Sequence, residues 1–482
     1  MRSRGKHFGK IVLSGLVLLT WFSCSKPEDP VPAAILEVDY SAIQIAKDGG
    51  GVLVEVETTF PWTITADESW VSLSRTGAPA SASVQIGASA NPTDQERTSS
   101  ITVRSENLTH LITLTQEAGD SIPVVVEDPV TIPPDETDMR PISSLELTAE
   151  MYAGWNIGNT LEAIGGETAW GNPLVTQLLI DSIKAAGFDA VRIPVAWSKF
   201  SDEENFTISK PWLTRVEQVV NYVLNSGMYA IINLHWDGGW MQPLYAEEEY
   251  VNNRLAIMWQ QIAIQFRDYD DRLLFAGSNE VLVEGEYGTP TEENYTVQNG
   301  FNQTFVTAVR MTGGRNHYRH LVVQGYNTNI NHTLSFFQMP EDVVEGRLSV
   351  EVHYYDPYNY TLNENSNITQ WGAIATDPEH TETWANESWV DDQFQQMKQR
   401  FIDNGVAVIL GEYGVISREE VPDSEVYRAY YLDYVTEAAA ANGLVPFYWD
   451  NGYLGNHSMA LFNRSTGEQA YPAIIHAIVV DD

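Results

Sequence analysis

Two glutamates of this chain each close a short apolar run. Glu280 ends the run Leu273–Glu280, whose small and apolar residues stop at Asn279, and Glu412 follows the apolar run Val406–Gly411. A run that is apolar on both faces is typical of a strand in a parallel sheet, and the polar residue at its end then lies where a barrel presents its site. Two carboxylates at such an edge suit glycosidic-bond hydrolysis, because one can protonate the leaving oxygen while the other, ionised, attacks the anomeric carbon.

The other predicted strands also end on polar or aromatic residues. An arginine beside an ionised carboxylate would favour its charged form, and a histidine or a tyrosine hydroxyl would orient it. An aromatic ring such as Trp449 offers a flat apolar face to the C–H side of a sugar. The strand ends, in chain order, are Trp155-Asn156-Ile157-Gly158-Asn159, Arg192, His235, Asn279-Glu280, Tyr326, His353-Tyr354-Tyr355, Glu412-Tyr413 and Trp449-Asp450-Asn451.

Strand and helix patterns alternate throughout residues 142–482 and predict an α/β fold, a (β/α)8 TIM barrel. The predicted strands are Gly154–Gly158, Ala190–Val195, Tyr229–Leu234, Leu273–Ser278, Leu321–Gly325, Leu348–Val352, Val406–Gly411 and Leu444–Tyr448. The predicted helices are Leu178–Ala186, Leu213–Asn225, Arg254–Phe266, Phe301–Met311, Phe394–Ile402 and Val426–Ala441. No GxGxxG or P-loop follows the first strand, which disfavours a nucleotide-binding, doubly wound sheet.

The chain before the barrel has a different pattern. Short segments that alternate polar and apolar residues, such as Val52–Glu57 and Trp62–Thr65, are separated by Gly, Pro, Asn and Asp, which predicts a small all-β, immunoglobulin-like sandwich. Residues 119–141 are rich in Pro, Asp, Glu and Thr without a helical period, and are a predicted semi-rigid linker. The predicted organisation is a signal peptide at 1–24, a tether at 25–34, the sandwich at 35–118, the linker at 119–141 and the barrel at 142–482.

The first residues have the features of a secretory signal. Basic residues up to Lys10 precede the apolar run Ile11–Phe22, and Ser23 stands before Cys24, the single cysteine of the chain. The run is shorter than a membrane-spanning helix, and one cysteine excludes an intramolecular disulfide. Lys and Arg number 27 against 65 Asp and Glu, a net charge of −38, which argues against nucleic acid and anionic membrane surfaces as partners.

The strand ends carry ordered motifs: GWNIGNT (Gly154–Thr160), ETAWGNP (Glu167–Pro173), VRIPVAW (Val191–Trp197), INLHWD (Ile232–Asp237), SNE (Ser278–Glu280), EVHYYDP (Glu351–Pro357), GEYG (Gly411–Gly414) and WDNG (Trp449–Gly452). Together they resemble glycoside hydrolase family 5, and most of all its subfamily 4 of endo-β-1,4-glucanases and xyloglucanases. The resemblance implies a retaining mechanism with Glu280 as acid/base and Glu412 as nucleophile. It also implies support from Arg192, His235, Asn279, His353 and Tyr355, and substrate contacts through Asn156, Trp236, Trp449 and Asp450.

One motif departs from the subfamily pattern. Many members carry His-His-Asp after the third strand, whereas this chain has His235-Trp236-Asp237. Because the first histidine is kept, we expect the chemistry to be unchanged and Trp236 to reshape a subsite.

The N-terminal part carries two further resemblances. Phe60-Pro61-Trp62, Ser69–Leu73 and Ile112–Gln116 resemble the BACON domain of gut Bacteroidetes proteins, which implies a glycan-binding module or a spacer, and we favour the spacer. The signal resembles those of bacterial lipoproteins, in which Cys24 becomes the lipidated N-terminus; the alternative is an ordinary signal peptide. We therefore expect a cell-surface, outer-membrane lipoprotein of a Gram-negative bacterium.

Other interpretations compete with a glucanase. The same scaffold could act as an endo-mannanase or glucomannanase, or as a non-catalytic surface glycan-binding lipoprotein. A metal-dependent hydrolase could use His235, Asp237, His353 and Glu412, but the chain has no HExxH and no HxH after the first strand. We expect a monomer without cofactor or metal, a β-glucan polysaccharide as substrate, and a pH optimum that is mildly acidic to neutral.

Overall fold

The computed structural model describes residues 33–118, except 48, 69, 90 and 92–94, and residues 132–479, except 236. The predicted signal peptide with Cys24, the tether up to residue 32 and residues 119–131 of the predicted linker lie outside the described residues, as does Trp236. Among the helices that are described, none combines the length and the apolar character that a bilayer crossing requires.

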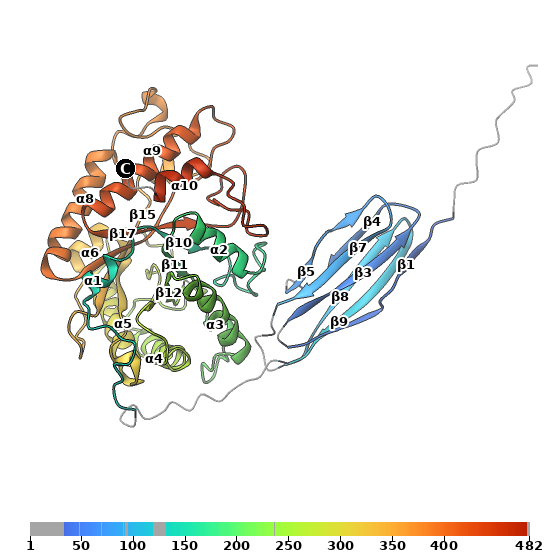
Figure 1. The fold of residues 1–482 in the computed structure, drawn as a ribbon, viewed down its shortest axis with the longest axis horizontal. Coiled ribbons are helices and arrows are strands. Elements are labelled where there is room, and N and C mark those ends of the chain that lie inside the picture. Colours follow the sequence, from blue (N-terminus) through green and yellow to red (C-terminus); the bar gives the residue numbers. More distant parts are fainter. Residues whose placement is uncertain are drawn as a thin grey trace, which may run out of the picture.

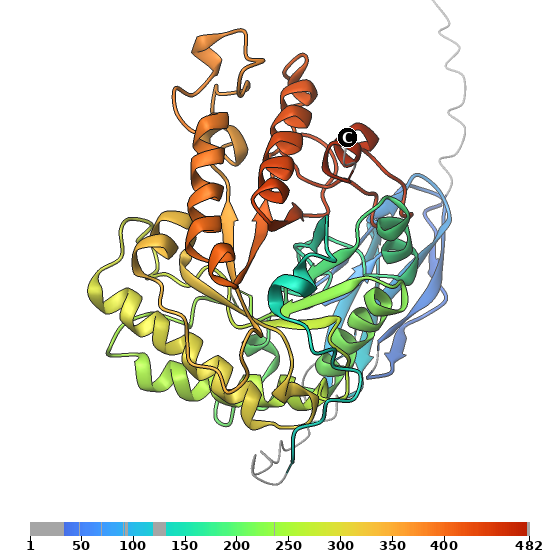
Figure 2. The same cartoon turned by 60° about the vertical axis from the view of Figure 1, so that its left-hand side comes forward.

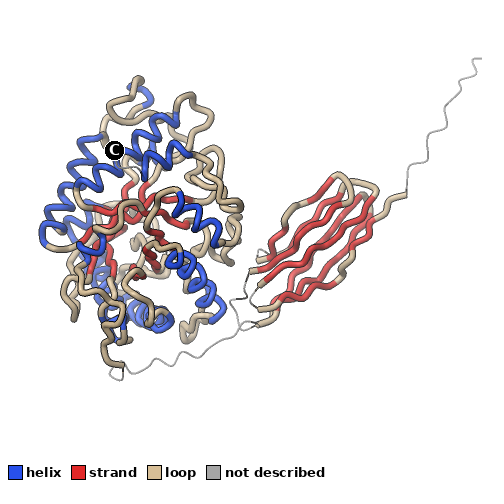
Figure 3. Tube along the Cα trace, in the orientation of Figure 1, coloured by secondary structure: helices blue, strands red, loops and turns tan. Residues whose placement is uncertain are grey.

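The N-terminal part is the predicted β-sandwich, with one sheet in the order β1-β3-β7-β5 and the other in the order β2-β9-β8-β4-β6 (Figures 1 and 3). Apolar side chains alternate with polar ones along each long strand, so the two inner faces form one core. The strands are β1 (Leu36–Val38), β2 (Ala42–Ile45), β3 (Gly50–Thr58), β4 (Trp62–Ala66), β5 (Val71–Leu73), β6 (Gly77–Ala78), β7 (Ala82–Ala88), β8 (Arg97–Ser105) and β9 (Leu108–Gln116).

The two tryptophans of the sandwich belong to its core. Trp62 is 2% exposed and donates its indole N–H to the carbonyl of Ala80 at 2.9 Å. Trp70 is 8% exposed and lies under the guanidinium of Arg97, 4.3 Å from the ring centroid. Both rings are therefore packed in the core of the sandwich and not exposed as flat faces.

The C-terminal part is a closed barrel of eight parallel strands in chain order, as predicted, with helices around the outside (Figures 1 and 2). Its strands are β10 (Gly154–Ile157), β11 (Ala190–Ile193), β12 (Tyr229–Asn233), β13 (Leu273–Ala276), β14 (Leu321–Asn329), β15 (Leu348–Tyr354), β16 (Ala407–Tyr413) and β17 (Leu444–Asp450). Its helices are α1 (Ser144–Thr148), α2 (Gln177–Ala185), α3 (Lys210–Asn225), α4 (Glu248–Gln265), α5 (Glu292–Met311), α6 (Ile330–Phe336), α7 (Tyr358–Thr361), α8 (Glu387–Arg400), α9 (Ser424–Ala441) and α10 (Pro472–Val479).

The barrel strands are buried on both faces, because one face lies against the helices and the other fills the barrel interior. The pairing of β15 with β16 shifts register between Val352 and His353, and the pairing of β16 with β17 shifts between Leu410 and Tyr413. Irregular pairing of this kind changes the direction in which the following side chains point. It falls at the ends of the strands that carry His353 and Glu412.

The last residues of the predicted linker lie against the barrel. The backbone N–H of Asp135 donates to the carbonyl of Gly314 at 3.1 Å, and Arg140 forms an ion pair of 2.7 Å with the buried Asp271. Met139 between them is buried. These contacts attach residues 134–140 to the barrel, although their Pro-rich composition indicated a linker.

Candidate active site

The predicted pair of carboxylates meets at the C-terminal end of the barrel. Glu280 follows β13, where its backbone has φ +49°, and Glu412 lies near the end of β16. An oxygen of Glu280 and an oxygen of Glu412 lie within 4.8 Å of each other. The Glu280 side chain is 39% exposed and the Glu412 side chain 7%, so the first faces the solvent and the second lies at the base of the site.

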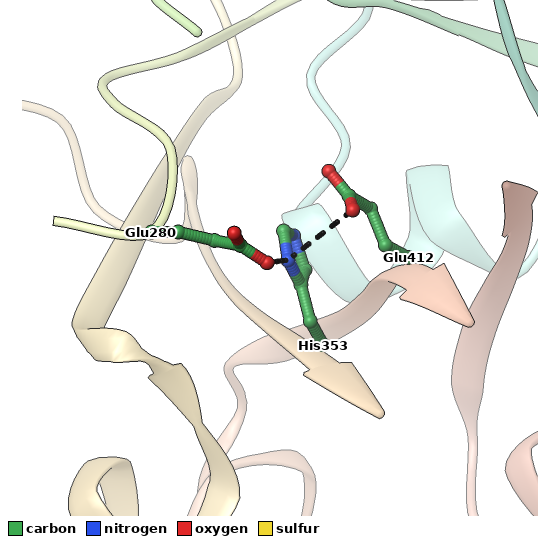
Figure 4. A group of neighbouring side chains, drawn as sticks. All are labelled: Glu280, His353 and Glu412. Carbon is green, nitrogen blue, oxygen red and sulfur yellow. Dashed lines mark hydrogen bonds and ion pairs between the residues drawn. The ribbon is translucent and has the colours of Figure 1, made fainter. Parts of the chain in front are cut away.

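His353 stands between the two carboxylates, as Figure 4 shows. Its Nδ1 lies 2.7 Å from Oε1 of Glu280 and 3.7 Å from Oε2 of Glu412. Burial opposes a positive charge on this ring, but the negative charges of Glu412, Glu280 and Glu351 outweigh burial and raise the pKa of His353 to about 9. The ring is therefore an imidazolium at neutral pH, and both of its nitrogens donate.

Arg192 on β11 binds the base of the site. Its guanidinium donates to Oε1 of Glu412 at 2.9 Å and to Oδ1 of Asn279 at 2.6 Å, and it is completely buried. The hydroxyl of Tyr355 donates to the other oxygen of Glu412 at 3.2 Å. These contacts fix the Glu412 carboxylate in one orientation. Arg192 contacts only the amide oxygen of Asn279, not its N–H groups.

His235 and Trp449 form a wall of the site. Their rings are stacked with centroids 5.8 Å apart and planes 12° apart. Burial, together with the positive charges of Arg192 and His353, lowers the pKa of His235 well below its ordinary value, so this ring is neutral. A neutral imidazole beside an indole face can donate to and accept from sugar hydroxyls without adding charge to the site.

The ionisation of Glu412 differs from the sequence-based expectation. The sequence predicts that a nearby arginine favours the charged form of this carboxylate, and Arg192 is in contact with it. Burial nevertheless outweighs the attraction of His353 and Arg192, and the pKa of Glu412 is raised above its ordinary value. The loss of activity on the acid side should therefore begin at a higher pH than an ordinary carboxyl would give.

Two residues predicted to contact the substrate do not line the site. Asn156 is completely buried, donates its amide to the carbonyl of Gly411 at 2.9 Å and accepts from Arg192 at 3.0 Å. Asp450 is also completely buried and forms an ion pair of 2.9 Å with Arg464. Neither side chain is in a position to contact a substrate, because both are buried and bonded to protein groups. Asn156 holds Arg192, and Asp450 fixes the chain after β17. Trp236 lies outside the described residues, so its predicted contact stays a prediction.

One buried carboxylate of the site received no role in the sequence-based prediction. Glu351 on β15 lies 2.9 Å from Arg192 and 3.1 Å from Nε2 of His353, and its side chain is 1% exposed. Its signal was present in the motif EVHYYDP: residues two apart on a strand share a face, so Glu351 had to lie on the same side as His353. A strand-interior carboxylate is rare unless it is paired.

The donor set does not favour a metal ion. Glu280, His353 and Glu412 place ligand atoms close enough together for one. However, both ring nitrogens of His353 already contact carboxylates, so neither points into open space. Asp237, another residue of the metal interpretation, accepts the backbone N–H groups of Trp197 and Ser198.

We therefore expect hydrolysis to survive removal of divalent ions. After exhaustive dialysis against EDTA, the rate of reducing-end release should stay within about 20% of the untreated rate, because every charge needed in the site comes from a side chain. A rate that falls by an order of magnitude with EDTA and returns with one added divalent cation would contradict this expectation.

An eight-stranded parallel barrel with two carboxylates within 4.8 Å of each other at its C-terminal mouth defines the class of retaining glycoside hydrolases. Inverting enzymes need a wider separation, about 6.5–9.5 Å, because a water molecule must fit beside the sugar.

Comparison with known proteins agrees with this class. Residues 156–455 match the model described as cellulase (glycosyl hydrolase family 5), and residues 60–117 match the BACON domain model. The chain belongs to glycosyl hydrolase family 5. The likeness includes the sandwich as well as the barrel. A xyloglucan-specific endo-β-1,4-glucanase of Bacteroides ovatus is 41% identical over 98% of this chain and 96% of its own length.

Solved structures give the same result. A Bacteroides ovatus family 5 xyloglucanase in complex with a XXXG heptasaccharide aligns with a TM-score of 0.69 over 92% of this chain and 99% of its own. A family 5 xyloglucanase from Paenibacillus pabuli is 43% identical and aligns with a TM-score of 0.67 over 69% of this chain and 98% of its own. A broad-specificity endoglucanase from Bacteroides salanitronis is 41% identical over 71% of this chain and 95% of its own, also with a TM-score of 0.67.

Proposed function

We propose that this protein is a retaining endo-β-1,4-glucanase whose preferred substrate is xyloglucan. The observation that carries the mechanism is the close approach of Glu280 and Glu412 with His353 between them. The substrate is proposed because the Bacteroides ovatus relative, which matches both the sandwich and the barrel, is named a xyloglucan-specific enzyme.

The first step makes a glycosyl-enzyme. Glu412, ionised and held by Arg192 and Tyr355, attacks the anomeric carbon while the bond from that carbon to the glycosidic oxygen breaks. Protonated Glu280, on the solvent side, gives its proton to the departing oxygen. Asn279 accepts from Arg192 through its oxygen, which leaves its amide N–H groups to donate to the sugar 2-hydroxyl. Both carboxylates thus act at the C-terminal mouth of the barrel.

The second step releases the sugar. Glu280, now ionised, removes a proton from a water molecule, the water oxygen attacks the anomeric carbon, and the ester bond to Glu412 breaks. Two successive displacements leave the anomeric configuration unchanged. In the form that starts the cycle, Arg192 and His353 carry two positive charges, and Glu412 and Glu351 two negative ones, so the buried part of the site is neutral.

The function is tested by product analysis on four polymers. Tamarind xyloglucan, carboxymethylcellulose, barley mixed-linkage glucan and glucomannan are digested under the same conditions and the products separated by chromatography. We expect tamarind xyloglucan to be cut fastest, to oligosaccharides rather than single sugars, and proton NMR to detect the β-anomer first. Fastest cleavage of glucomannan would favour the mannanase interpretation, and no cleavage of any polymer would favour a non-catalytic glycan-binding protein.

We infer that the enzyme is a monomeric lipoprotein held at the outer surface of the outer membrane through Cys24. The proposal rests on the basic and apolar residues before Cys24 and on the tether that follows it. Full-length protein expressed in a Gram-negative host should enter the detergent phase of a Triton X-114 extraction, and Cys24→Ser should move it to the aqueous phase. If the two proteins partition equally, Cys24 carries no lipid and the protein is an ordinary secreted enzyme.

A further inference from the structure

The pair Glu351 and His353 forms a buried connection behind the acid/base. Oε1 of Glu351 lies 3.1 Å from Nε2 of His353, and Nδ1 of the same ring lies 2.7 Å from Oε1 of Glu280. Glu351 is itself anchored by Arg192 at 2.9 Å. These contacts link the carboxylate deep in the barrel to the carboxylate at its mouth through a single imidazole.

Glu351 fits inside the barrel because Gly411, on the neighbouring strand, has no side chain. A Cβ at Gly411, the residue before Glu412, would overlap the carboxylate of Glu351. The neighbouring strand β16 is therefore without a side chain at the point where β15 places a buried negative charge. Because a buried carboxylate is stabilised only by close opposite charge and hydrogen bonds, Glu351 depends on Arg192 and on His353 as a donor.

The protonation state of His353 decides where the Glu280 proton lies. If both ring nitrogens carry hydrogen, Nδ1–H donates to Oε1 of Glu280, and the acid proton must reside on the other oxygen. If the ring is neutral, the hydrogen stays on Nε2, which faces the charged Glu351, and Nδ1 becomes an acceptor. A protonated Glu280 would then donate to the histidine instead of the glycosidic oxygen.

We propose that Glu351 is a positioning residue that keeps both nitrogens of His353 as donors and thereby directs the Glu280 proton to the oxygen that faces the substrate. The inference rests on the proposed function, in which Glu280 is the acid/base. Glu351 touches neither the sugar nor the reacting atoms; it acts through His353.

The proposal carries a pH dependence with a definite sign. The titratable and charged groups around His353 are Glu280 after β13, Glu412 on β16, Arg192 on β11, His235 after β12, Glu351 on the same strand and Tyr355 just after it. Glu351→Gln removes one negative charge from this set, which lowers the pKa of His353 from about 9. The fall of kcat/KM on the basic side should therefore begin at lower pH.

The experiment measures kcat/KM against pH for wild type and Glu351→Gln with two aryl β-cellotriosides. Phenol is a poor leaving group and needs the acid, whereas 2,4-dinitrophenol leaves without protonation. For the phenyl substrate at pH 8 we expect a loss of about 10- to 100-fold and a basic limb shifted by roughly one pH unit or more. For the dinitrophenyl substrate we expect a change of no more than about threefold. Equal losses on both substrates with an unshifted limb would overturn the proposal.

Asp342→Asn is the matched control, because Asp342 is a similarly buried carboxylate that forms an ion pair of 2.7 Å with Arg310 on the outer helix α5. It should lower stability without shifting the pH profile. Glu280→Ala tests the acid/base assignment separately from the role of Glu351. If it fails to discriminate between the leaving groups, the acid/base assignment is wrong; if it discriminates and Glu351→Gln does not, only the role of Glu351 fails.

A measurement on the wild-type protein replaces the variant if Glu351→Gln does not fold. The ring of His353 can be titrated by NMR, with a His353→Gln sample to assign its signals. A ring that stays protonated through pH 8 supports the proposal. A ring that is neutral at pH 7 overturns it, because Nδ1 would then accept the Glu280 proton.

Discussion

Glu412→Ala is expected to lose activity on xyloglucan by on the order of 10⁵-fold, because no other group can form the glycosyl-enzyme. Azide, an anion small enough for the space that the carboxylate leaves, should restore part of the turnover when an activated aryl glycoside is supplied. Its attack replaces the first of the two displacements, so the product should be the α-glycosyl azide, which NMR identifies. Glu425→Ala, which changes a half-exposed carboxylate on α9, is the control and should keep wild-type activity.

Full glycanase activity of Glu412→Ala would contradict the assignment of the nucleophile.

The stability of a Glu412 variant tests the effect of burial on this carboxylate independently. Because burial raises the pKa of Glu412, the ionised carboxylate favours the folded state less than the protonated one does. The group's contribution to stability is present at low pH and declines as the pH rises through its unfolded and folded pKa values. At pH 7, Glu412→Gln should therefore have a melting temperature equal to or above that of wild type, and a clear fall would show that the Arg192 pair dominates instead.

Glu280→Ala is expected to lower kcat/KM for xyloglucan by about 10³-fold, the usual contribution of a general acid. The loss should nearly vanish with 2,4-dinitrophenyl β-cellotrioside, because the dinitrophenolate needs no proton to leave. With that substrate the glycosyl-enzyme forms and accumulates, since no base activates water in the second step. Mass spectrometry of the rapidly quenched protein should detect the added glycosyl group.

The configuration of the azide product distinguishes the two glutamates. In Glu280→Ala, azide attacks the glycosyl-enzyme in place of activated water, so the β-glycosyl azide should form. An α-glycosyl azide from Glu280→Ala, or a β-glycosyl azide from Glu412→Ala, would exchange the two roles. Asp423→Ala, which removes an exposed carboxylate just before α9, serves as the control and should form no glycosyl azide.

The barrel could be predicted from the sequence because its strands are buried on both faces. Each strand then appears as a short apolar run, and each run matched an observed strand within a few residues. Some helices were missed for an equally physical reason. Helix α6 has seven residues and α7 four, too few turns for an amphipathic period to appear. Helix α10 has eight residues, which is also short for a period to be read from the sequence.

The sequence by itself was enough to predict which residues carry the chemistry. Glu280 and Glu412 were identifiable because an apolar run that stops on a carboxylate is a local pattern, and because parallel strands bring their ends to one edge. The fold class followed from the alternation of strand and helix patterns along the chain, because consecutive parallel strands joined through helices tend to lie side by side. These properties depend on neighbours along the chain, which the sequence displays directly.

Only the tertiary structure decided what each polar residue at a strand end does. Asn156 is buried because its partners Gly411 and Arg192 come from distant strands, and Asp450 is buried because Arg464 in the following loop folds back onto it. Glu351 is held by an ion pair with Arg192 on another strand, and it fits there because Gly411 has no side chain. The direction of a side chain at the barrel mouth depends on strand stagger and irregular pairing between segments far apart in sequence. The separation of the two carboxylates, and hence the retaining mechanism, depends on that same long-range packing.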